Sequence, residues 1–353
     1  MLENVKILGL SGAKKIAKTV GEKLKIKPMR VTISNFADGE ILVRPEEPVR
    51  NQKIFVIQSL TKPVNESLME LLVCLDALKR ANAREIVVLL TYYAYARQDR
   101  KASGREPISA KLVALLIEKA GANHVITLDV HCDQIQGFFE IPFDTLRIGN
   151  LGVSEAIKTL NKNKLCVVSP DYGCVKRARE FAKKLNCELA ILDKRRPKPN
   201  VVEILNILGD VKGKDCLIID DMIDTAGTIC LAAKAIKNAG ARTVNVIATH
   251  AILSGPAKER ITQSFKEGSI NHLVISNTIP TVYDFKDKHV TVFDISKFVV
   301  GVIKVIFSKN LSLSKSNISI LTGIDLSVLL TTDSKLNLAY FAPSAKGTYL
   351  ILL

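Results

Sequence analysis

Short apolar runs that end in turn residues alternate with amphipathic segments along most of this chain. The apolar runs predict buried strands, because a short apolar stretch closed by polar or small residues fits a strand covered on both faces. They lie at 5–10, 31–34, 54–58, 86–90, 125–129, 165–169, 189–192, 216–219 and 244–249. The segments between them, such as 66–81 and 175–185, carry apolar residues at helical spacing. Strands that alternate with helices of this length predict an α/β fold with a mainly parallel sheet.

Two segments of similar sequence indicate that the chain contains two related halves. Ala81-Asn-Ala-Arg-Glu-Ile-Val-Val88 resembles Ala239-Gly-Ala-Arg-Thr-Val-Asn-Val246, and each follows a strand, a loop and a helix. We therefore expect two similar domains joined near residue 150, over 1–150 and 151–310. A length of 353 residues is sufficient for two domains with buried cores.

The second half carries an acidic element that the first half lacks. The apolar run 216–219 ends in Asp220 and Asp221, and the small-residue run 224–228 then leads into a predicted helix. In open α/β sheets, ligands bind beyond the carboxyl ends of strands, and the N-terminus of a helix favours an anion. Carboxylates accept hydrogen bonds from sugar hydroxyls, so the element fits a sugar phosphate. The alternative is an acidic strand end followed by a helix with a threonine N-cap.

Three further polar clusters follow predicted strands. They are His131 after 125–129, Asp171 after 165–169, and the basic residues 194–196 after 189–192. Because the carboxyl ends of parallel strands lie on one edge of a sheet, these clusters and the acidic element predict one shared active site. Each also has a simpler interpretation: a hydrogen-bonded structural histidine, a helix N-cap, and a basic patch for nuclear localisation or nucleic acid.

The segment 92–107 interrupts the alternation of strands and helices. It has little apolar content and carries Arg97, Arg100, Lys101 and Arg105. Long charged loops are uncommon inside compact α/β units unless they are functional, so we expect a functional loop here. A solvated surface loop is the alternative. The motif Asp38-Gly39-Glu40 is by itself an ordinary turn.

The composition of the chain narrows the classes of molecule that the protein could bind. The net charge of +15 fits nucleic acid, a membrane surface or phosphorylated small molecules. The lysines are spread along the chain, and no aromatic-rich basic repeat is present, which argues against nucleic acid. The apolar stretch 298–307 contains Lys304 and is too short to span a bilayer. We therefore expect neither a nucleic-acid nor a membrane partner.

The cysteines and the chain start indicate the compartment. The seven cysteines form no CxxC pair, and several lie inside apolar runs, as expected of core thiols in a reducing environment. The first residues do not resemble a signal peptide. Both features predict a cytoplasmic protein. The sequence also has no Walker A motif, no GxGxxG motif and no zinc-spaced Cys/His set.

The polar clusters together resemble the ribose-phosphate diphosphokinase family, also called phosphoribosyl pyrophosphate synthetases. The matching motifs run collinearly along the chain. They are Phe36-Ala-Asp-Gly-Glu40, Tyr95-Ala-Arg-Gln-Asp-Arg100, His131 with Gln134-Ile-Gln-Gly-Phe-Phe139, Ser169-Pro-Asp171, Asp193-Lys-Arg-Arg-Pro197 and Asp220-Asp-Met-Ile-Asp-Thr-Ala-Gly-Thr228. The resemblance implies two phosphoribosyltransferase-like domains, each a mainly parallel sheet flanked by helices, and relatives that assemble as hexamers.

The resemblance also implies a reaction and a set of roles. The reaction is transfer of the diphosphoryl group of ATP to the anomeric hydroxyl of ribose 5-phosphate. Lys194 and Arg196 would be catalytic, and His131 and Asp171 would hold Mg²⁺. The ATP-binding residues would be Asp38, Gly39, Glu40, Arg97 and Gln98. The ribose 5-phosphate-binding residues would be Arg196, Asp220, Asp221, Asp224, Thr225, Ala226, Gly227 and Thr228. The segment 92–107 would close as a lid.

Three departures from the family pattern leave alternatives open. Gly173 is followed by Cys174, where relatives have a second glycine, and this would matter if the backbone there needed a positive φ. The lid has Ala102, Ser103 and Gly104 where relatives often carry another arginine, and the tail 311–353 has no family counterpart. A non-catalytic regulatory paralogue is therefore one alternative. A phosphoribosyltransferase that acts on a base is another, because it needs only the acidic element.

Overall fold

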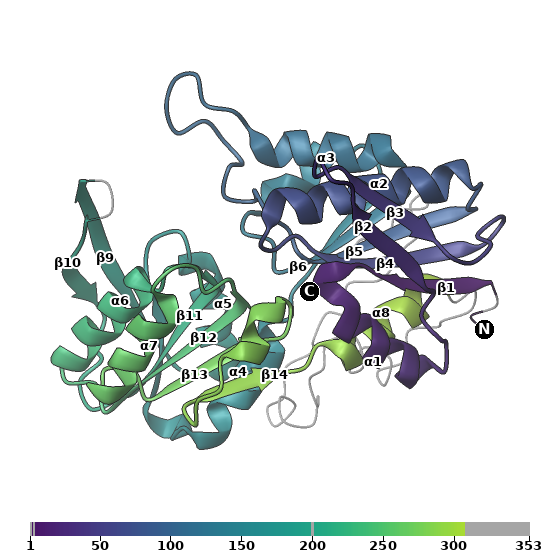
Figure 1. Ribbon diagram of the computed structural model, residues 1–353. Coiled ribbons are helices and arrows are strands. Elements are labelled where there is room, and N and C mark those ends of the chain that lie inside the picture. Colours follow the sequence, from purple (N-terminus) through teal and green to yellow (C-terminus); the bar gives the residue numbers. More distant parts are fainter. Residues whose placement is uncertain (1, 3, 199–200, 308–353) are drawn as a thin grey trace. The chain divides into compact units, whose positions relative to one another are not determined.

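The chain folds into two compact units. The computed structural model describes residues 2, 4–198 and 201–307, with the backbone alone at 159, 162, 194–198 and 201–205. One unit comprises Met1–Arg147 and the segment that starts at Ile295, and the other is Ile148–Asp294 (Figure 1). The expected tail 311–353 lies outside the described residues. Among the described residues, no helix combines the length and apolar character needed to cross a membrane.

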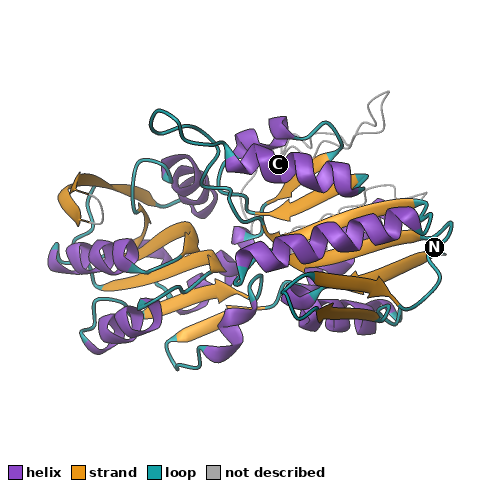
Figure 2. Ribbon diagram, turned by 45° about the horizontal axis from the view of Figure 1, so that its top comes forward, coloured by secondary structure: helices purple, strands orange, loops and turns teal. Residues whose placement is uncertain are grey.

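The first unit is built on a parallel five-stranded sheet in the order β1-β4-β5-β6-β7. Its strands are β1 (Val5–Gly9), β4 (Lys53–Ser59), β5 (Glu85–Tyr92), β6 (His124–Leu128) and β7 (Phe143–Leu146), and its helices are α1 (Lys14–Leu24), α2 (Val64–Arg80), α3 (Ser109–Ala120) and α8 (Ser296–Phe307). Helices α2 and α3 cover one face, and α1 and α8 the other (Figures 1 and 2). This two-sided cover explains why strands such as β4 are almost continuously apolar.

A small antiparallel pair stands apart from this sheet. It consists of β2 (Val31–Asn35) and β3 (Ile41–Pro45), and β3 packs against α2. The Asp38-Gly39-Glu40 motif forms the turn between the two strands. Gly39 has φ +95, a left-handed conformation that glycine adopts at little cost, and this explains the glycine at this position.

The second unit has a seven-stranded sheet in the order β10-β9-β8-β11-β12-β13-β14. The strands are β8 (Leu165–Ser169), β9 (Glu188–Lys198), β10 (Val201–Leu208), β11 (Asp215–Ile223), β12 (Thr243–Ala251), β13 (His272–Ser276) and β14 (Val290–Phe293), and the helices are α4 (Gly149–Ala156), α5 (Val175–Leu185), α6 (Gly227–Asn238) and α7 (Ala257–Lys266). All neighbouring strands are parallel except β9 and β10. Both sheets therefore confirm the predicted α/β fold.

Alternation of side chains along β12 distributes the helices over both faces of the second sheet. Val246 and Ala248 lie in one buried cluster with residues of α6 and α7. The intervening Ile247 points to the opposite face, where Gly152 of α4 packs against it. A Cβ at Gly152 would lie 2.6 Å from the Ile247 Cδ1 atom, so the close approach of α4 depends on a glycine.

The end of the described chain corrects the expected domain over 151–310. Helix α8 groups with the first unit, where it packs on α1, and the division between the units falls after Arg147. The ring of Phe307 lies edge-on to Phe55 of β4, with centroids 6.1 Å apart. Helix α8 is apolar on most sides, and it completes the cover of the first sheet. The sequence could not show this, because apolar periodicity identifies a buried helix but not the sheet that buries it.

Candidate active site

The second sheet brings three of the four predicted polar clusters to adjacent strand ends. Strand β8 lies between β9 and β11 and is parallel to both, so the residues that follow β8 and β11 emerge beside each other. His131 instead follows β6, in the sheet of the first unit. The expectation that all four clusters share one sheet edge is therefore wrong for His131. The cause is that the chain forms two separate sheets.

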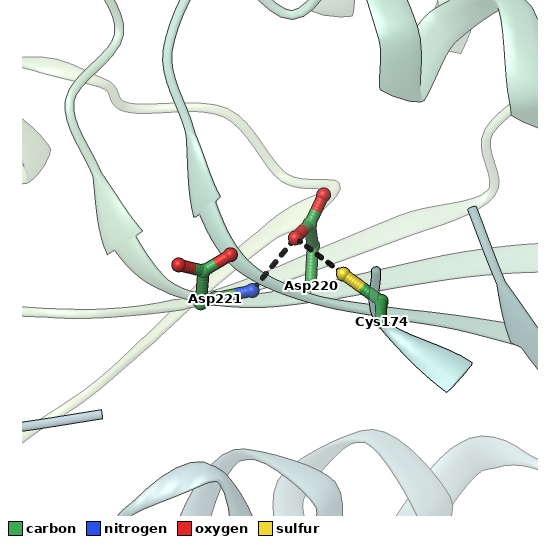
Figure 3. Close-up of side chains that lie close together, drawn as sticks. All are labelled: Cys174, Asp220 and Asp221. Atoms are coloured by element: carbon green, nitrogen blue, oxygen red, sulfur yellow. Dashed lines mark hydrogen bonds between the residues drawn. The ribbon is translucent and has the colours of Figure 1, made fainter. Parts of the chain in front are cut away.

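The centre of this edge is a contact between Cys174, Asp220 and Asp221 (Figure 3). The thiol of Cys174 donates a hydrogen bond to Asp220 Oδ1 over 3.3 Å, and the backbone N–H of Asp221 donates to the same oxygen over 2.8 Å. Asp221 is 3% exposed, whereas Asp220 is partly exposed. The ligand atoms of the three side chains lie within 4.8 Å of one another.

Burial and mutual repulsion shape the electrostatics of this cluster. Burial raises the pKa of Asp220 well above its ordinary value, and the nearby carboxylates of Asp221 and Asp171 raise it further. The pKa of Cys174 is raised by burial and then by the charge of Asp220, so the thiol keeps its proton. A protonated thiol can act as the donor that the geometry shows.

The backbone at Cys174 does not need a glycine. Cys174 precedes α5 with φ −89 and ψ −2, an ordinary right-handed conformation. Its N–H donates to Asp171 Oδ1 over 3.2 Å, so Asp171 stabilises the turn that leads into the helix. The departure from the family pattern at this position thus adds a side chain without backbone strain.

The loop between β11 and α6 reaches the helix without a side-chain cap. The N-cap residue is Ala226, with φ +59 and ψ 0, and no side chain caps the helix there. The alternative of a threonine N-cap is therefore wrong. A left-handed residue followed by right-handed ones turns successive N–H groups to one side, and such a backbone nest binds anions. Asp224 and Thr228 flank this nest, and Thr225 is exposed.

The residues predicted to bind ATP lie in two places in the first unit. Asp38, Gly39 and Glu40 are exposed in the β2–β3 turn, where the Glu40 N–H donates to Asp38 Oδ1 over 3.1 Å. Arg97 and Gln98 are exposed in the connection between β5 and α3. Gln98 is fixed to the start of α3, because its Oε1 accepts a hydrogen bond from the Ser109 hydroxyl over 2.7 Å.

The predicted lid, 92–107, is exposed in its second half, whereas its first residues, such as Tyr92 and Tyr93, are buried. Every residue from Arg100 to Pro107 is exposed, and the loop extends away from the start of α3 (Figure 1). Its local order comes from Glu106, whose carboxylate accepts the N–H groups of Ala102 and Ser103 over 2.7 and 2.9 Å. The charged character of this segment thus agrees with its exposure.

The predicted catalytic residues are on a projecting strand. Lys194 and Arg196 belong to β9, which continues past the end of β8 and pairs with β10, so that Lys194 lies opposite Ile204. The side chains of Lys194 and Arg196 lie outside the described residues. His131 is exposed in the first unit, and Asp171 is partly exposed in the second.

Arg260 is a residue of the site that the sequence did not single out. It lies on α7, and its Nη1 donates to the carbonyl of Thr225 over 2.9 Å. Nothing in the local sequence marks it, because the contact joins segments 35 residues apart. An arginine shortly after the Ser254-Gly255-Pro256 turn carries no motif of its own.

This fold and site define a protein of the phosphoribosyltransferase type. Residues 5–121 match the N-terminal domain of ribose phosphate pyrophosphokinase, and residues 151–285 match the phosphoribosyl transferase domain. The chain belongs to the ribose-phosphate pyrophosphokinase family, whose members are transferases.

Individual relatives support this assignment over most of the chain. The ribose-phosphate pyrophosphokinase of Mycoplasma genitalium is 47% identical over 309 residues, which cover 87% of this chain and 92% of that protein. The ribose-phosphate pyrophosphokinase of Bacillus caldolyticus is 52% identical over 78% of this chain and 86% of that protein. The crystal structure of phosphoribosylpyrophosphate synthetase from Mycobacterium smegmatis superposes with a TM-score of 0.81 at 38% identity, covering 87% of this chain and all of that one.

Proposed function

We propose that this protein transfers the diphosphoryl group of ATP to the anomeric hydroxyl of ribose 5-phosphate, giving 5-phosphoribosyl 1-diphosphate and AMP for nucleotide biosynthesis. The observation that carries the proposal is the pairing of Asp220 and Asp221 with the uncapped start of α6 at Ala226. A carboxylate pair and an anion-binding nest, one after the other on a single strand–loop–helix unit, fit the two ends of a sugar phosphate.

The acceptor half of the site would lie entirely in the second unit. The 5-phosphate would bind at the backbone of Asp224, Thr225, Ala226, Gly227 and Thr228, where the nest and the helix dipole favour an anion. The ribose hydroxyls would donate to Asp220 and Asp221. Asp220 has one oxygen already engaged by Cys174 and Asp221, so its Oδ2 is the natural acceptor for a sugar hydroxyl.

The residues proposed for the donor half are those that the family resemblance implies. Asp38, Gly39, Glu40, Arg97 and Gln98 would bind ATP in the first unit. Lys194 and Arg196 would stabilise the charge that develops on the transferred group, and Arg196 would also contact ribose 5-phosphate. Phosphoryl transfer depends mainly on positioning and electrostatic stabilisation, so cations on a projecting strand suit it better than a nucleophilic side chain.

The oxygen ligands of the site suit magnesium. The partly exposed carboxylate of Asp171 is a hard oxygen ligand, as Mg²⁺ prefers, whereas the thiol of Cys174 is soft and does not suit it. Asp171 in the second unit would be one ligand of the ion, with water and phosphate oxygens at other positions. His131 in the first unit is a further proposed ligand, which the family resemblance implies. When bound, Mg²⁺ would neutralise charge on the phosphates of ATP.

The segment 92–107, through its exposed part 100–107, would close over the bound substrates. Closure would exclude water, which otherwise competes with ribose 5-phosphate as the acceptor of the diphosphoryl group. By its family the protein would work in the cytoplasm as a homo-hexamer, with small-molecule partners and without nucleic acid or membrane.

The direct test is an AMP-forming assay with ATP, Mg²⁺ and ribose 5-phosphate. We expect stoichiometric AMP and phosphoribosyl diphosphate from the full chain and from a chain that ends at residue 310. A folded protein that binds ribose 5-phosphate without forming AMP would contradict the proposal and favour a regulatory paralogue. Release of diphosphate only on addition of a purine or pyrimidine base would contradict it in favour of a base phosphoribosyltransferase.

A further inference from the structure

Four consecutive carbonyl groups leading into α6 are all engaged by hydrogen bonds. The carbonyls of Ile223 and Asp224 accept the N–H groups of Leu253 and Ser254 over 3.1 and 2.9 Å. The carbonyl of Thr225 accepts Arg260 Nη1 over 2.9 Å, and that of Ala226 accepts the Cys230 N–H over 3.0 Å. Only the Thr225 carbonyl is held by a side chain. The orientation of its peptide group therefore depends on one residue, Arg260.

The hydrogen bonds to these carbonyls also fix the direction of the N–H group in each peptide. In a planar trans peptide, the C=O and N–H vectors point in opposite directions. The bonds to the carbonyls of Asp224, Thr225 and Ala226 therefore turn the N–H groups of Thr225, Ala226 and Gly227 to the other side. Those three N–H groups donate to no other described residue. They form the donor surface on which a phosphate would sit.

Arg260 lies directly against this loop. A Cβ at Gly227 would come within 3.3 Å of Arg260 Nη1, so the glycine gives the guanidinium room to reach the Thr225 carbonyl. Arg260 is an exposed residue of α7, and it forms no ion pair with a carboxylate in the part of the chain that the structure describes. Its charge thus adds to the positive potential at the start of α6 while its hydrogen bond fixes the peptide.

We infer that Arg260 is a positioning residue for the 5-phosphate, which acts by orienting the Thr225–Ala226 peptide so that its N–H faces the ligand. The inference rests on the proposed function, because it takes the phosphate at this loop to be that of ribose 5-phosphate. Without Arg260, the Thr225 carbonyl would lose its partner, and this peptide could rotate to present an oxygen to the phosphate.

The test compares Arg260→Met, Arg260→Lys and Lys266→Ala with the unmodified chain. Arg260→Met keeps the aliphatic stem and removes the donor, and Arg260→Lys retains a donor. Lys266→Ala removes an equal charge from the same helix, at another exposed position. We expect Arg260→Met to raise the KM for ribose 5-phosphate about tenfold or more, with the KM for ATP and kcat within about threefold. Arg260→Lys should restore most of the original KM for ribose 5-phosphate. Lys266→Ala should change this KM by less than about twofold.

Ribose without its 5-phosphate separates this role from a general loss of structure. Binding of ribose, measured by calorimetry, should be the same for Arg260→Met and the unmodified chain, because no phosphate then depends on the Thr225–Ala226 peptide. Equal losses with ribose and ribose 5-phosphate, or an unchanged KM for ribose 5-phosphate, would overturn the inference. Calorimetric binding of ribose 5-phosphate repeats the comparison without catalysis. An unmodified chain that forms no AMP would contradict the proposed function. The affinities of Arg260→Met and of the unmodified chain for ribose 5-phosphate would still decide the role of Arg260.

Discussion

The thiol of Cys174 and the carboxylate of Asp220 are joined by a hydrogen bond of 3.3 Å that links the start of α5 to β11. Relatives are expected to have a glycine at position 174, so this contact is a feature of the present chain. The thiol binds the same Asp220 oxygen as the Asp221 N–H, so this contact does not engage the second oxygen of the carboxylate. The added side chain is therefore compatible with a sugar bound at Asp220.

Replacement of Cys174 by glycine should change the kinetics only slightly. A thiol is a weak donor, and the backbone at Cys174 is right-handed, a conformation that glycine also adopts. We expect kcat and the KM for ribose 5-phosphate of Cys174→Gly to stay within about threefold of the original values. Steady-state kinetics with ribose 5-phosphate as the varied substrate checks this. Cys187→Ala, at a partly buried cysteine on another part of the second unit, serves as the control. A gain or loss beyond tenfold would show that Cys174 is a determinant of the site.

Replacement of Asp220 by asparagine should stabilise the fold and weaken binding. The Oδ1 atom of asparagine can still accept the bonds from Cys174 and Asp221, while the charge that repels Asp221 is removed. We expect Asp220→Asn to raise Tm by a few degrees, roughly 1 kcal/mol, at neutral pH. The affinity for ribose 5-phosphate should fall about tenfold.

The pH dependence of the increase in stability expected for Asp220→Asn identifies its cause. The pKa of Asp220 is raised in the folded state, so the folded protein binds the proton more tightly than the unfolded chain. Stability is therefore lost as the pH rises from the unfolded pKa, about 3.9, through the raised value. Asp220→Asn should show its full gain at neutral pH and none at a pH below about 3.9. Asp284→Asn, at an exposed position, should have the same Tm as the original chain; a gain that persists unchanged in acid would contradict the electrostatic explanation.

Removal of Asp215 should destabilise the second unit. Asp215 is fully buried at the start of β11, where it accepts the Asn161 N–H over 2.9 Å and the Thr243 hydroxyl over 2.6 Å and pairs with Arg242. Asp215→Ala leaves these groups without their acceptor, and we expect a loss of about 2–4 kcal/mol. Denaturant unfolding followed by circular dichroism measures it. Asp210→Ala removes an exposed partner of Lys214 and should have a much smaller effect; equal effects would refute the assigned importance of burial.

Replacement of Lys194 by alanine should impair the chemical step more than binding of the acceptor. We expect kcat to fall about 100-fold or more, because a cation that stabilises developing charge acts mainly in the transition state. Calorimetry should show ribose 5-phosphate binding within about threefold of the original affinity. Lys198→Ala, on the same strand, is the matched control. A turnover that survives the loss of Lys194 would remove it from the mechanism.

The sequence was sufficient to predict much of the fold, and it supplied the residues proposed for the acceptor half of the site. Apolar runs such as 54–57 and 216–219 are buried on both faces, which is why their strands could be read without a structure. The acidic pair and the small-residue loop could also be identified from the sequence, because they are contiguous in it. The family motifs supplied the roles of Lys194 and His131, which no local pattern could have given.

Tertiary structure decided what depends on contacts between distant segments. Helix α8 returns to the first unit, and His131 lies on a different sheet from Asp171, because sheet membership is set by long-range strand pairing. The right-handed backbone of Cys174 and the bond from Arg260 to Thr225 were likewise invisible in the sequence. The sequence thus determined which residues we propose for the sugar-phosphate site, since the local pattern indicates where strands give way to loops. The structure determined how the loop presents its N–H groups, because Leu253, Ser254 and Arg260, which bind three of its carbonyls, lie about 30 to 35 residues further along the chain.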